Sequence, residues 1–182
     1  MAIESNTKLV ISYLVEKRTA ADAMEFMKDF SERVRGSLQL TTDGMTGYPP
    51  AVEECFGADI DYAQLVKVYG RPKEAGPDWY GPPEVIAAVP TPISGEPKSW
   101  LISTSHVERA NLSVRTHLRR FVRLTSGHSK KLENLKACVN IYMAWFNLCR
   151  VHETLRVTPA MQAGITDHIW RMEEMLTWTS KP

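Results

Sequence analysis

Apolar and polar residues follow strand-like and helix-like patterns in turn along the first 70 residues. Lys8–Val15 is a short apolar run rich in β-forming residues, and it follows a turn-like segment at 5–7. A helix is predicted from a cap at Thr19, where Asp22 completes a capping box, to Gly36. Its apolar stripe recurs every three to four residues and consists of Ala23, Phe26, Met27, Phe30 and Val34.

Two further strands and a short helix are predicted before residue 70. Residues 37–42 alternate between apolar and polar side chains and lead into Asp43 and a glycine. A short helix is predicted to begin at the adjacent prolines 49–50 and to end at Gly57. Tyr62–Tyr69 is the next strand.

The second half of the chain is predicted to be helical. Residues 70–98 carry seven of the eleven prolines, which predicts an irregular excursion rather than a core element. A short helix is predicted within 158–164, from a Thr-Pro start to a glycine, and a last helix from a cap at Thr166 or Asp167 through Leu176. Two longer helices have apolar stripes formed by Val107, Ala110, Val114, Leu118 and Phe121, and by Leu132, Leu135, Val139, Tyr142, Phe146 and Cys149.

These elements predict an α/β fold with an extended C-terminal helical portion. The length of 182 residues is that of one domain of ordinary size. We therefore expect a single domain over 1–182, with an α/β core part at 1–69, a proline-rich insertion at 70–98 and a basic helical part at 99–182.

The formal net charge of +1 hides an uneven distribution of charge. Residues 1–108 hold 16 acidic and ten basic side chains, whereas residues 109–182 hold five acidic and twelve basic ones. Such an excess is either a solvated helix face or a surface for a polyanion, since Lys and Arg that neutralise phosphates release condensed counterions. Within 109–136 only Glu133 opposes Arg109, Arg115, Arg119, Arg120, Arg123, Lys130, Lys131 and Lys136.

Composition also narrows the cellular setting. No apolar run approaches the roughly 20 residues of a membrane-spanning helix, and the N-terminus lacks the pattern of a secretory signal. The three cysteines are scattered and odd in number, so no disulfide framework is expected. We expect a cytoplasmic protein without a membrane partner.

Two carboxylates are candidates for chemistry. Asp43 follows a predicted strand, at the edge where open α/β sheets bind ligands, although Asp-Gly turns are common in their own right. Glu108 lies in the first turn of a predicted helix, three residues after Ser105, which also fits a capping box. On that helix Glu108 shares a face with Asn111, Arg115 and Arg119. Such a face suits either a metal ligand beside a phosphate backbone or an exposed row of ion pairs.

Several stretches resemble a bacterial insertion-sequence transposase of the DDE type. They are QLTTDG (39–44), FGADIDYAQLVKVYG (56–70), STSHVERANLSVR (103–115), RRFVRLT (119–125) and FNLCRVHETLRVTPAMQAG (146–164). The resemblance implies an RNase H-like domain that binds two Mg²⁺ or Mn²⁺ ions through an Asp, Asp, Glu triad and cleaves and joins DNA strands. It implies that Asp43 is the second Asp and Glu108 the Glu of that triad, and that Arg109, Asn111 and Arg115 face DNA.

Residues 1–182 lack the segment that carries the first triad Asp in this family. We therefore expect a catalytic-domain fragment, truncated at the first strand of the RNase H-like fold and inactive. The expected partners are DNA and, in an active form, further copies of the chain in a bacterial cytoplasm. The alternatives are a non-catalytic DNA-binding remnant and a helical interaction protein. His106 is interpreted as an exposed residue at a helix start, and His152 as a polar residue at a helix end.

Overall fold

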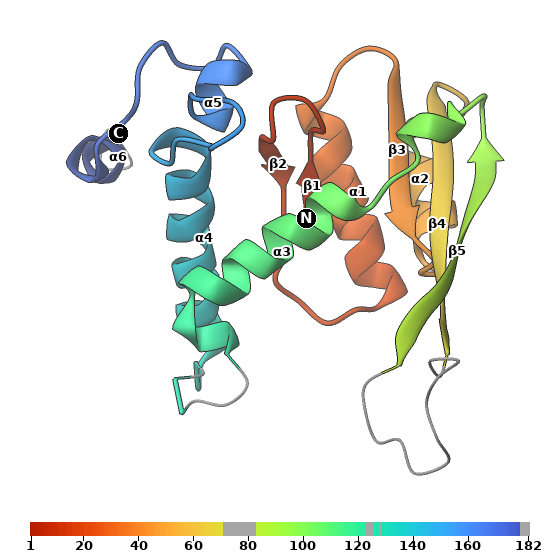
Figure 1. Ribbon diagram of the computed structural model, residues 1–182, viewed down its shortest axis with the longest axis horizontal. Coiled ribbons are helices and arrows are strands. Elements are labelled where there is room, and N and C mark those ends of the chain that lie inside the picture. Colours follow the sequence, from red (N-terminus) through yellow and green to blue (C-terminus); the bar gives the residue numbers. More distant parts are fainter. Residues whose placement is uncertain (71–82, 123–125, 128, 179–182) are drawn as a thin grey trace. The chain divides into compact units, whose positions relative to one another are not determined.

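The computed structural model describes residues 1–70, 83–122, 126–127 and 129–178 (Figure 1). They form two compact units, one of Met1–Val15 with Ser105–Pro182 and one of Glu16–Thr104, here called the helical unit and the sheet unit. Together they contain helices and a mixed sheet of three strands, which confirms the predicted α/β class. That the whole chain is one domain with an insertion at 70–98 stays a prediction.

The sheet unit begins with a helix whose start is fixed by its sequence. The Asp22 N–H donates to Thr19 Oγ1 at 3.2 Å, and the Thr19 N–H donates to Asp22 Oδ2 at 3.0 Å, so the predicted capping box is formed. The unit consists of α1 (Ala20–Arg33), β3 (Leu38–Asp43), α2 (Tyr48–Phe56), β4 (Ile60–Gly70), β5 (Glu84–Ser94) and the 3₁₀ turn η1 (Ser99–Leu101).

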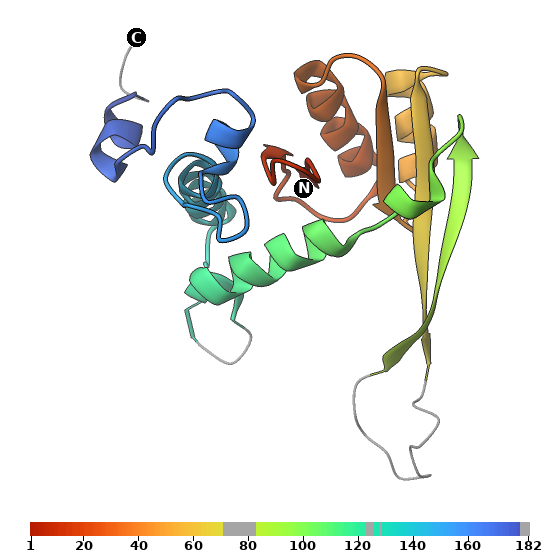
Figure 2. The same ribbon diagram turned by 45° about the horizontal axis from the view of Figure 1, so that its top comes forward.

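The strands of this unit lie side by side in the order β3, β4, β5 (Figures 1 and 2). β3 runs parallel to β4 with Asp43 opposite Leu65, and β5 runs antiparallel to β4. Helices α1 and α2 pack on each other, and Phe30 and Phe56 bring their ring centroids to 5.7 Å. The first half of β4 is buried, with Tyr62 at 1% exposure. The core of the unit therefore lies beside the end of the sheet where Leu38 of β3 pairs with Ile60 of β4.

The interpretation of 70–98 as wholly irregular is wrong for Glu84–Ser94. This segment is β5, and it pairs with β4 over almost its whole length despite containing Pro90 and Pro92. Proline is tolerated in a strand at the edge of a sheet, where a missing N–H on the outer side removes no ladder hydrogen bond. Residues 71–82 of the predicted insertion lie outside the described residues.

The helical unit consists of a two-stranded sheet and the C-terminal helices. In Figures 1 and 2, α3 crosses the direction of α4 steeply. The core contains Val10, Val114, Val139, Tyr142, Met143 and Phe146. The elements are β1 (Ala2–Ile3), β2 (Val10–Ser12), α3 (Ser105–His117), the 3₁₀ turn η2 (Arg119–Phe121), α4 (Leu132–Leu148), α5 (Pro159–Gln162) and α6 (Met172–Trp178).

Three predicted boundaries in this unit are wrong. The strand predicted at Lys8–Val15 is limited to β2. Helix α3 ends at His117, because Leu118 adopts an extended backbone, yet Phe121 still packs on the core from η2. The last helix begins at Met172, not after Thr166 or Asp167.

The two predicted caps of α6 are engaged elsewhere. The Trp170 indole N–H donates to Thr166 Oγ1 at 2.9 Å, and Asp167 Oδ1 lies 2.7 Å from His168 Nδ1. Both side chains thus have partners other than the N-terminus of a helix. The short helix α5 is as predicted, since Thr158 Oγ1 accepts from the Met161 N–H and Pro159 occupies the first turn. Within the described ranges, no helix has both the length and the apolar character to cross a bilayer.

Candidate functional site

Asp43 is the last residue of β3 and is exposed. It therefore lies where β3, a strand parallel to its neighbour, ends at the sheet edge. The turn that follows passes close to β4: a Cβ on Gly44 would lie 3.1 Å from Val66 Cγ2, closer than most side-chain contacts. The glycine after Asp43 thus allows the chain to turn tightly against β4.

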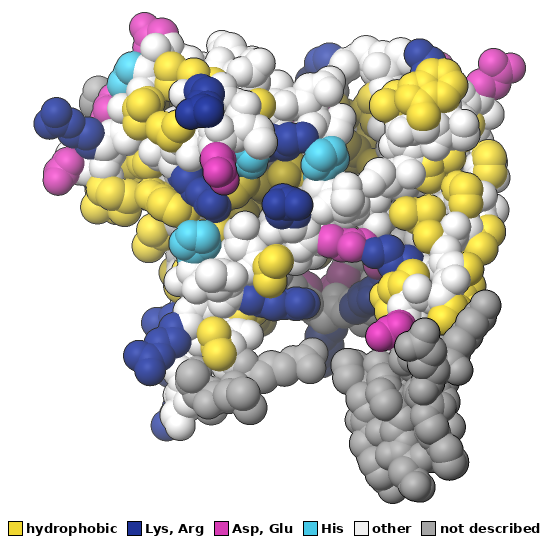
Figure 3. Space-filling view, viewed as in Figure 1, with side chains coloured by type: hydrophobic (Ala, Val, Ile, Leu, Met, Phe, Trp, Pro, Cys, Tyr) yellow, Lys and Arg dark blue, Asp and Glu magenta, His cyan; other side chains and the backbone are white. Residues whose placement is uncertain are grey.

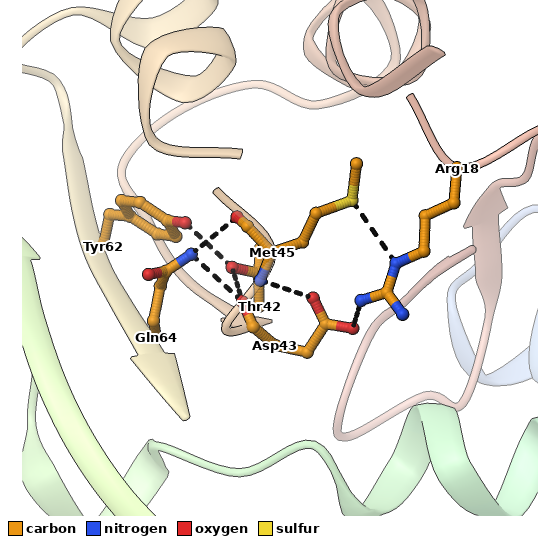
Figure 4. Close-up of polar contacts among 6 residues, drawn as sticks. All are labelled: Arg18, Thr42, Asp43, Met45, Tyr62 and Gln64. Atoms are coloured by element: carbon orange, nitrogen blue, oxygen red, sulfur yellow. Dashed lines mark hydrogen bonds and ion pairs between the residues drawn. The ribbon is translucent and has the colours of Figure 1, made fainter. Parts of the chain in front are cut away.

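The Asp43 carboxylate has two partners within the sheet unit (Figure 4). Its Oδ2 lies 2.5 Å from the Arg18 guanidinium, and its Oδ1 accepts from the Met45 N–H at 3.2 Å. Arg18 also directs its Nε–H at the Met45 sulfur, at 3.4 Å. Sequence patterning did not predict Arg18 as a partner of Asp43, because Arg18 is 25 residues away and carries no motif.

The backbone around Asp43 is held by a side chain of β4. The Gln64 amide donates to the main-chain carbonyls of Asp43 and Met45, at 3.1 and 3.2 Å. Next to it, Thr42 Oγ1 donates to the Asp43 carbonyl at 3.0 Å and lies 2.8 Å from the Tyr62 hydroxyl. Since the single Thr42 hydroxyl hydrogen is used, the Tyr62 hydroxyl is the donor in that pair. Burial raises the pKa of Tyr62, so this hydroxyl is a donor at any physiological pH.

The donor set around Asp43 does not by itself fit a divalent cation. Mg²⁺ and Mn²⁺ take several oxygen ligands, and carboxylates supply them in phosphoryl-transfer sites. Both Asp43 oxygens already accept from neighbours, one of them the cationic Arg18. Among residues 1–70, 83–122, 126–127 and 129–178, no three Asp, Glu, His or Cys side chains are grouped to hold a metal ion. The predicted metal-binding role of Asp43 and Glu108 stays a prediction.

Helix α3 directs an apolar face to the core and a charged face to solvent, as the sequence predicts. Ala110 and Val114 are buried in the core of the helical unit. Of the predicted charged face, Glu108, Asn111 and Arg115 lie on α3 and are exposed, as is the neighbouring Arg109. The prediction that Arg119 shares this face is wrong, because α3 ends at His117 and Arg119 lies in η2. Beyond α3, Arg119, Arg120, Lys130 and Lys131 are exposed and Lys136 is half-buried, whereas Arg123 lies outside the described residues.

Asp43 and Glu108 belong to different units. Asp43 lies in the sheet unit and Glu108 lies in the helical unit. That the two carboxylates face one cleft stays a prediction.

A second group of polar side chains comes together within the helical unit. Lys8 Nζ lies 3.3 Å from Nδ1 of His106, and the charge of Lys8 also reaches His152. Both histidines are half-buried, so the interpretation of His106 as an exposed residue at a helix start is wrong. The three residues come from distant parts of the sequence, and no local spacing could have grouped them.

A search of protein-family models, of curated proteins and of solved structures finds no match to this chain.

Proposed function

We propose that this chain is a DDE-type transposase by descent that binds DNA but does not cleave or join it. The observation that carries the proposal is the placement of the two candidate carboxylates on their elements. Asp43 closes a strand that is parallel to its neighbour, and Glu108 lies in the first turn of a later helix with basic residues beside it. Both placements agree with the roles that the resemblance implies.

The parallel pairing of β3 with β4 supports the RNase H-like sheet that the resemblance implies. In the described residues β1 and β2 form one small sheet, and β3, β4 and β5 form another. β3, which ends in Asp43, is an edge strand here.

The chemistry at Asp43 favours a non-catalytic protein. Strand cleavage in the family requires oxygen ligands from several elements to converge. In the sheet unit Asp43 is instead paired with Arg18 and tied to the Met45 N–H. This pairing gives Asp43 a structural partner and supports the interpretation that the chemistry has been lost.

The surface of α3 favours binding to nucleic acid. Arg109, Asn111 and Arg115 are exposed on one helix, and residues 109–182 hold twelve basic against five acidic side chains. Basic side chains on an exposed helix face can neutralise backbone phosphates, and the affinity then depends strongly on salt. We expect binding to duplex DNA without sequence preference.

The test is duplex binding measured by fluorescence anisotropy between low and physiological salt. We expect log affinity to fall linearly with log salt concentration, and Arg115→Gln with Arg119→Gln to reduce the slope by up to about 2, since each phosphate contact contributes roughly 0.9. A matched pair, Lys28→Gln with Arg35→Gln, removes the same charge from exposed residues of the sheet unit and should leave the slope nearly unchanged.

The same measurement separates the alternative of a helical interaction protein. That alternative is favoured if the chain fails to bind duplex DNA even at low salt, or if binding does not depend on salt. The basic residues of α3 would then be a solvated face.

A further inference from the structure

Five nitrogen-bearing side chains of the helical unit converge from three segments of the chain. Lys8 lies in the turn between β1 and β2, His106 and Arg109 lie in the first two turns of α3, and Arg150 and His152 follow α4. The charges of Lys8 and Arg109 act on both imidazoles, so the segments meet. On the face drawn in Figure 3, Lys, Arg and His side chains gather around the β1–β2 turn and the start of α3.

The two turns that carry this cluster are built with unusual backbone conformations. Lys8 has a φ of +60° and Arg156 a φ of +64°, and they are the non-glycine residues with positive φ among those that the structure describes. Each turn is closed by backbone hydrogen bonds of 2.9 Å, from Lys8 N–H to the Glu4 carbonyl and from Arg156 N–H to the His152 carbonyl. Residues with a side chain rarely adopt this conformation, and where they do the site is often functional.

The hydrogen bonds of the two imidazoles leave a donor for a ligand. An ammonium can only donate, so His106 Nδ1 accepts from Lys8 and the proton of the neutral ring lies on Nε2. His152 Nδ1 is engaged by the Thr154 hydroxyl at 3.0 Å. Within the described part of the chain, the Nε2 atoms of His106 and His152 form no hydrogen bond in addition to these Nδ1 contacts.

The cluster is short of negative charge. Burial, followed by Lys8 and Arg109, lowers the pKa of His106, and burial, followed by Arg150, lowers that of His152. Of the carboxylates that act on these rings, Glu4 accepts hydrogen bonds from the Asn6 and Thr7 N–H groups. Burial raises the pKa of Glu4, but these hydrogen bonds and the charge of Lys8 hold that pKa below its usual value. Among the residues that the structure describes, the charged groups that act on the two imidazoles are Glu4, Lys8, Arg109, Arg150 and Glu153.

We propose that Lys8, His106, Arg109 and His152 form a binding site for a phosphate group. Ammonium, guanidinium and imidazole N–H groups donate to phosphate oxygens in charge-assisted hydrogen bonds. The surrounding Lys and Arg charges disfavour a metal cation at the same two histidines. The phosphate belongs either to a DNA backbone or to a free phosphate compound, and only the first source rests on the proposed function.

A phosphate bound here favours the imidazolium form of both histidines. Binding therefore raises the pKa of each ring and takes up protons. Both rings are neutral at pH 8, because their pKa values in the free protein lie below the ordinary 6.5. Affinity for a phosphodiester, whose charge is constant in this range, accordingly increases as the pH falls from 8 towards 5.5. A free phosphate monoester loses one charge at about pH 6, which opposes the increase.

The experiment uses residues 1–182 with isotope-labelled histidine, and follows the imidazole resonances by NMR. The two probes are inorganic phosphate and a 20-base-pair duplex, each against chloride at equal ionic strength. We expect both the His106 and His152 pKa values to rise with a bound probe. His168, which pairs with Asp167 and Glu174 in the same unit, is the internal control and should not respond.

Variants then test the contacts, with folding checked by the spectrum of the remaining amides. Lys8→Gln and His152→Gln should each weaken phosphate binding about tenfold, the loss expected for one charge-assisted hydrogen bond. Lys8→Arg retains the charge and should retain most of the affinity, so a loss in Lys8→Gln alone reports on the charge.

Each outcome is informative. A response to both probes assigns the site to the DNA backbone, and a response to inorganic phosphate alone assigns it to a free phosphate compound even if duplex binding fails. If neither probe shifts His106 or His152 at pH 6, or if His168 shifts equally, the proposal is wrong. Duplex binding lost in the Arg115 and Arg119 variant but not in Lys8→Gln would support the proposed function while excluding the DNA backbone as the ligand of this site.

Discussion

At the scale of single residues, the turn after β3 shows which contacts hold Asp43 in place. The ion pair with Arg18 is exposed, with 69% of the Arg18 side chain and 51% of the Asp43 side chain accessible. Exposed pairs contribute about 0–1 kcal/mol. The hydrogen bond between Thr42 and Tyr62 is buried, with 8% and 1% of these residues exposed. The buried bond, rather than the ion pair, is therefore expected to fix the end of β3.

This difference predicts an asymmetry between two conservative substitutions. Thr42→Val keeps the shape of the residue but leaves the buried Tyr62 hydroxyl without its acceptor, at a cost of about 1–3 kcal/mol. Tyr62→Phe removes the donor, and Thr42 keeps its bond to the Asp43 carbonyl, so the cost is only about 1 kcal/mol. Free energies of unfolding from urea titrations measure both. Equal losses, or a larger loss for Tyr62→Phe, would contradict the assignment of Tyr62 as the donor.

Residue patterns predict local contacts and fail for distant ones. The capping box of Thr19 and Asp22 was predictable because its partners are three residues apart. Asp43 was predictable as a strand-end residue, since alternation and a following glycine mark the end of β3. Arg18 and Lys8 were not, because the groups they meet, Asp43 and His106, are brought to them by the fold.

At the scale of elements, β5 is the strand that the sequence pattern did not predict. Pro90 and Pro92 made 70–98 look irregular, yet the strand pairs with β4. Residues two apart direct their N–H groups to the same side of a strand, so both missing donors belong on the outer edge. β5 exposes Val85, Ile86, Val89 and Ile93, at 44–59%. Prolines on such an edge prevent it from pairing with another strand.

Restoring the edge donors is therefore predicted to promote self-association. Pro90→Val with Pro92→Val returns two N–H groups to the outer side of β5. The mean molecular mass of this double variant should therefore increase with protein concentration. Light scattering after size exclusion measures this. Thr91→Val is the matched control, since it adds the same β-forming side chain where the N–H faces β4. If the control associates as much as the double variant, exposed apolar area rather than the edge is responsible.

At the scale of the whole molecule, the two residues that the resemblance would unite belong to different units. Asp43 closes β3 in the sheet unit, and Glu108 begins α3 in the helical unit. The sequence predicted both elements but carries no pattern that reports how two units dock. The small sheet of β1 and β2 and the larger sheet that begins with β3 share no strand in the part that the structure describes.

These features predict that residues 1–182 do not cleave or join DNA strands. Phosphoryl transfer of this kind needs several fixed oxygen ligands, and losing one costs on the order of a thousandfold in rate. Asp43 is instead paired with Arg18 and Met45, and among the described residues no three Asp, Glu, His or Cys side chains are grouped to hold a metal ion. The measurement is nicking of supercoiled plasmid and joining of labelled duplexes, in Mg²⁺ and in Mn²⁺, with Asp43→Asn as the background.

Arg18→Ala separates two reasons for the same inactivity. If Arg18 only blocks a complete site, removing its guanidinium frees Asp43 Oδ2 and activity should appear. If the ligand set is incomplete, Arg18→Ala stays at the level of Asp43→Asn, which is the expected result. Metal-dependent nicking by the unsubstituted chain that Asp43→Asn abolishes would show that the carboxylates do converge, and the chain would then be an active nuclease rather than a DNA-binding remnant.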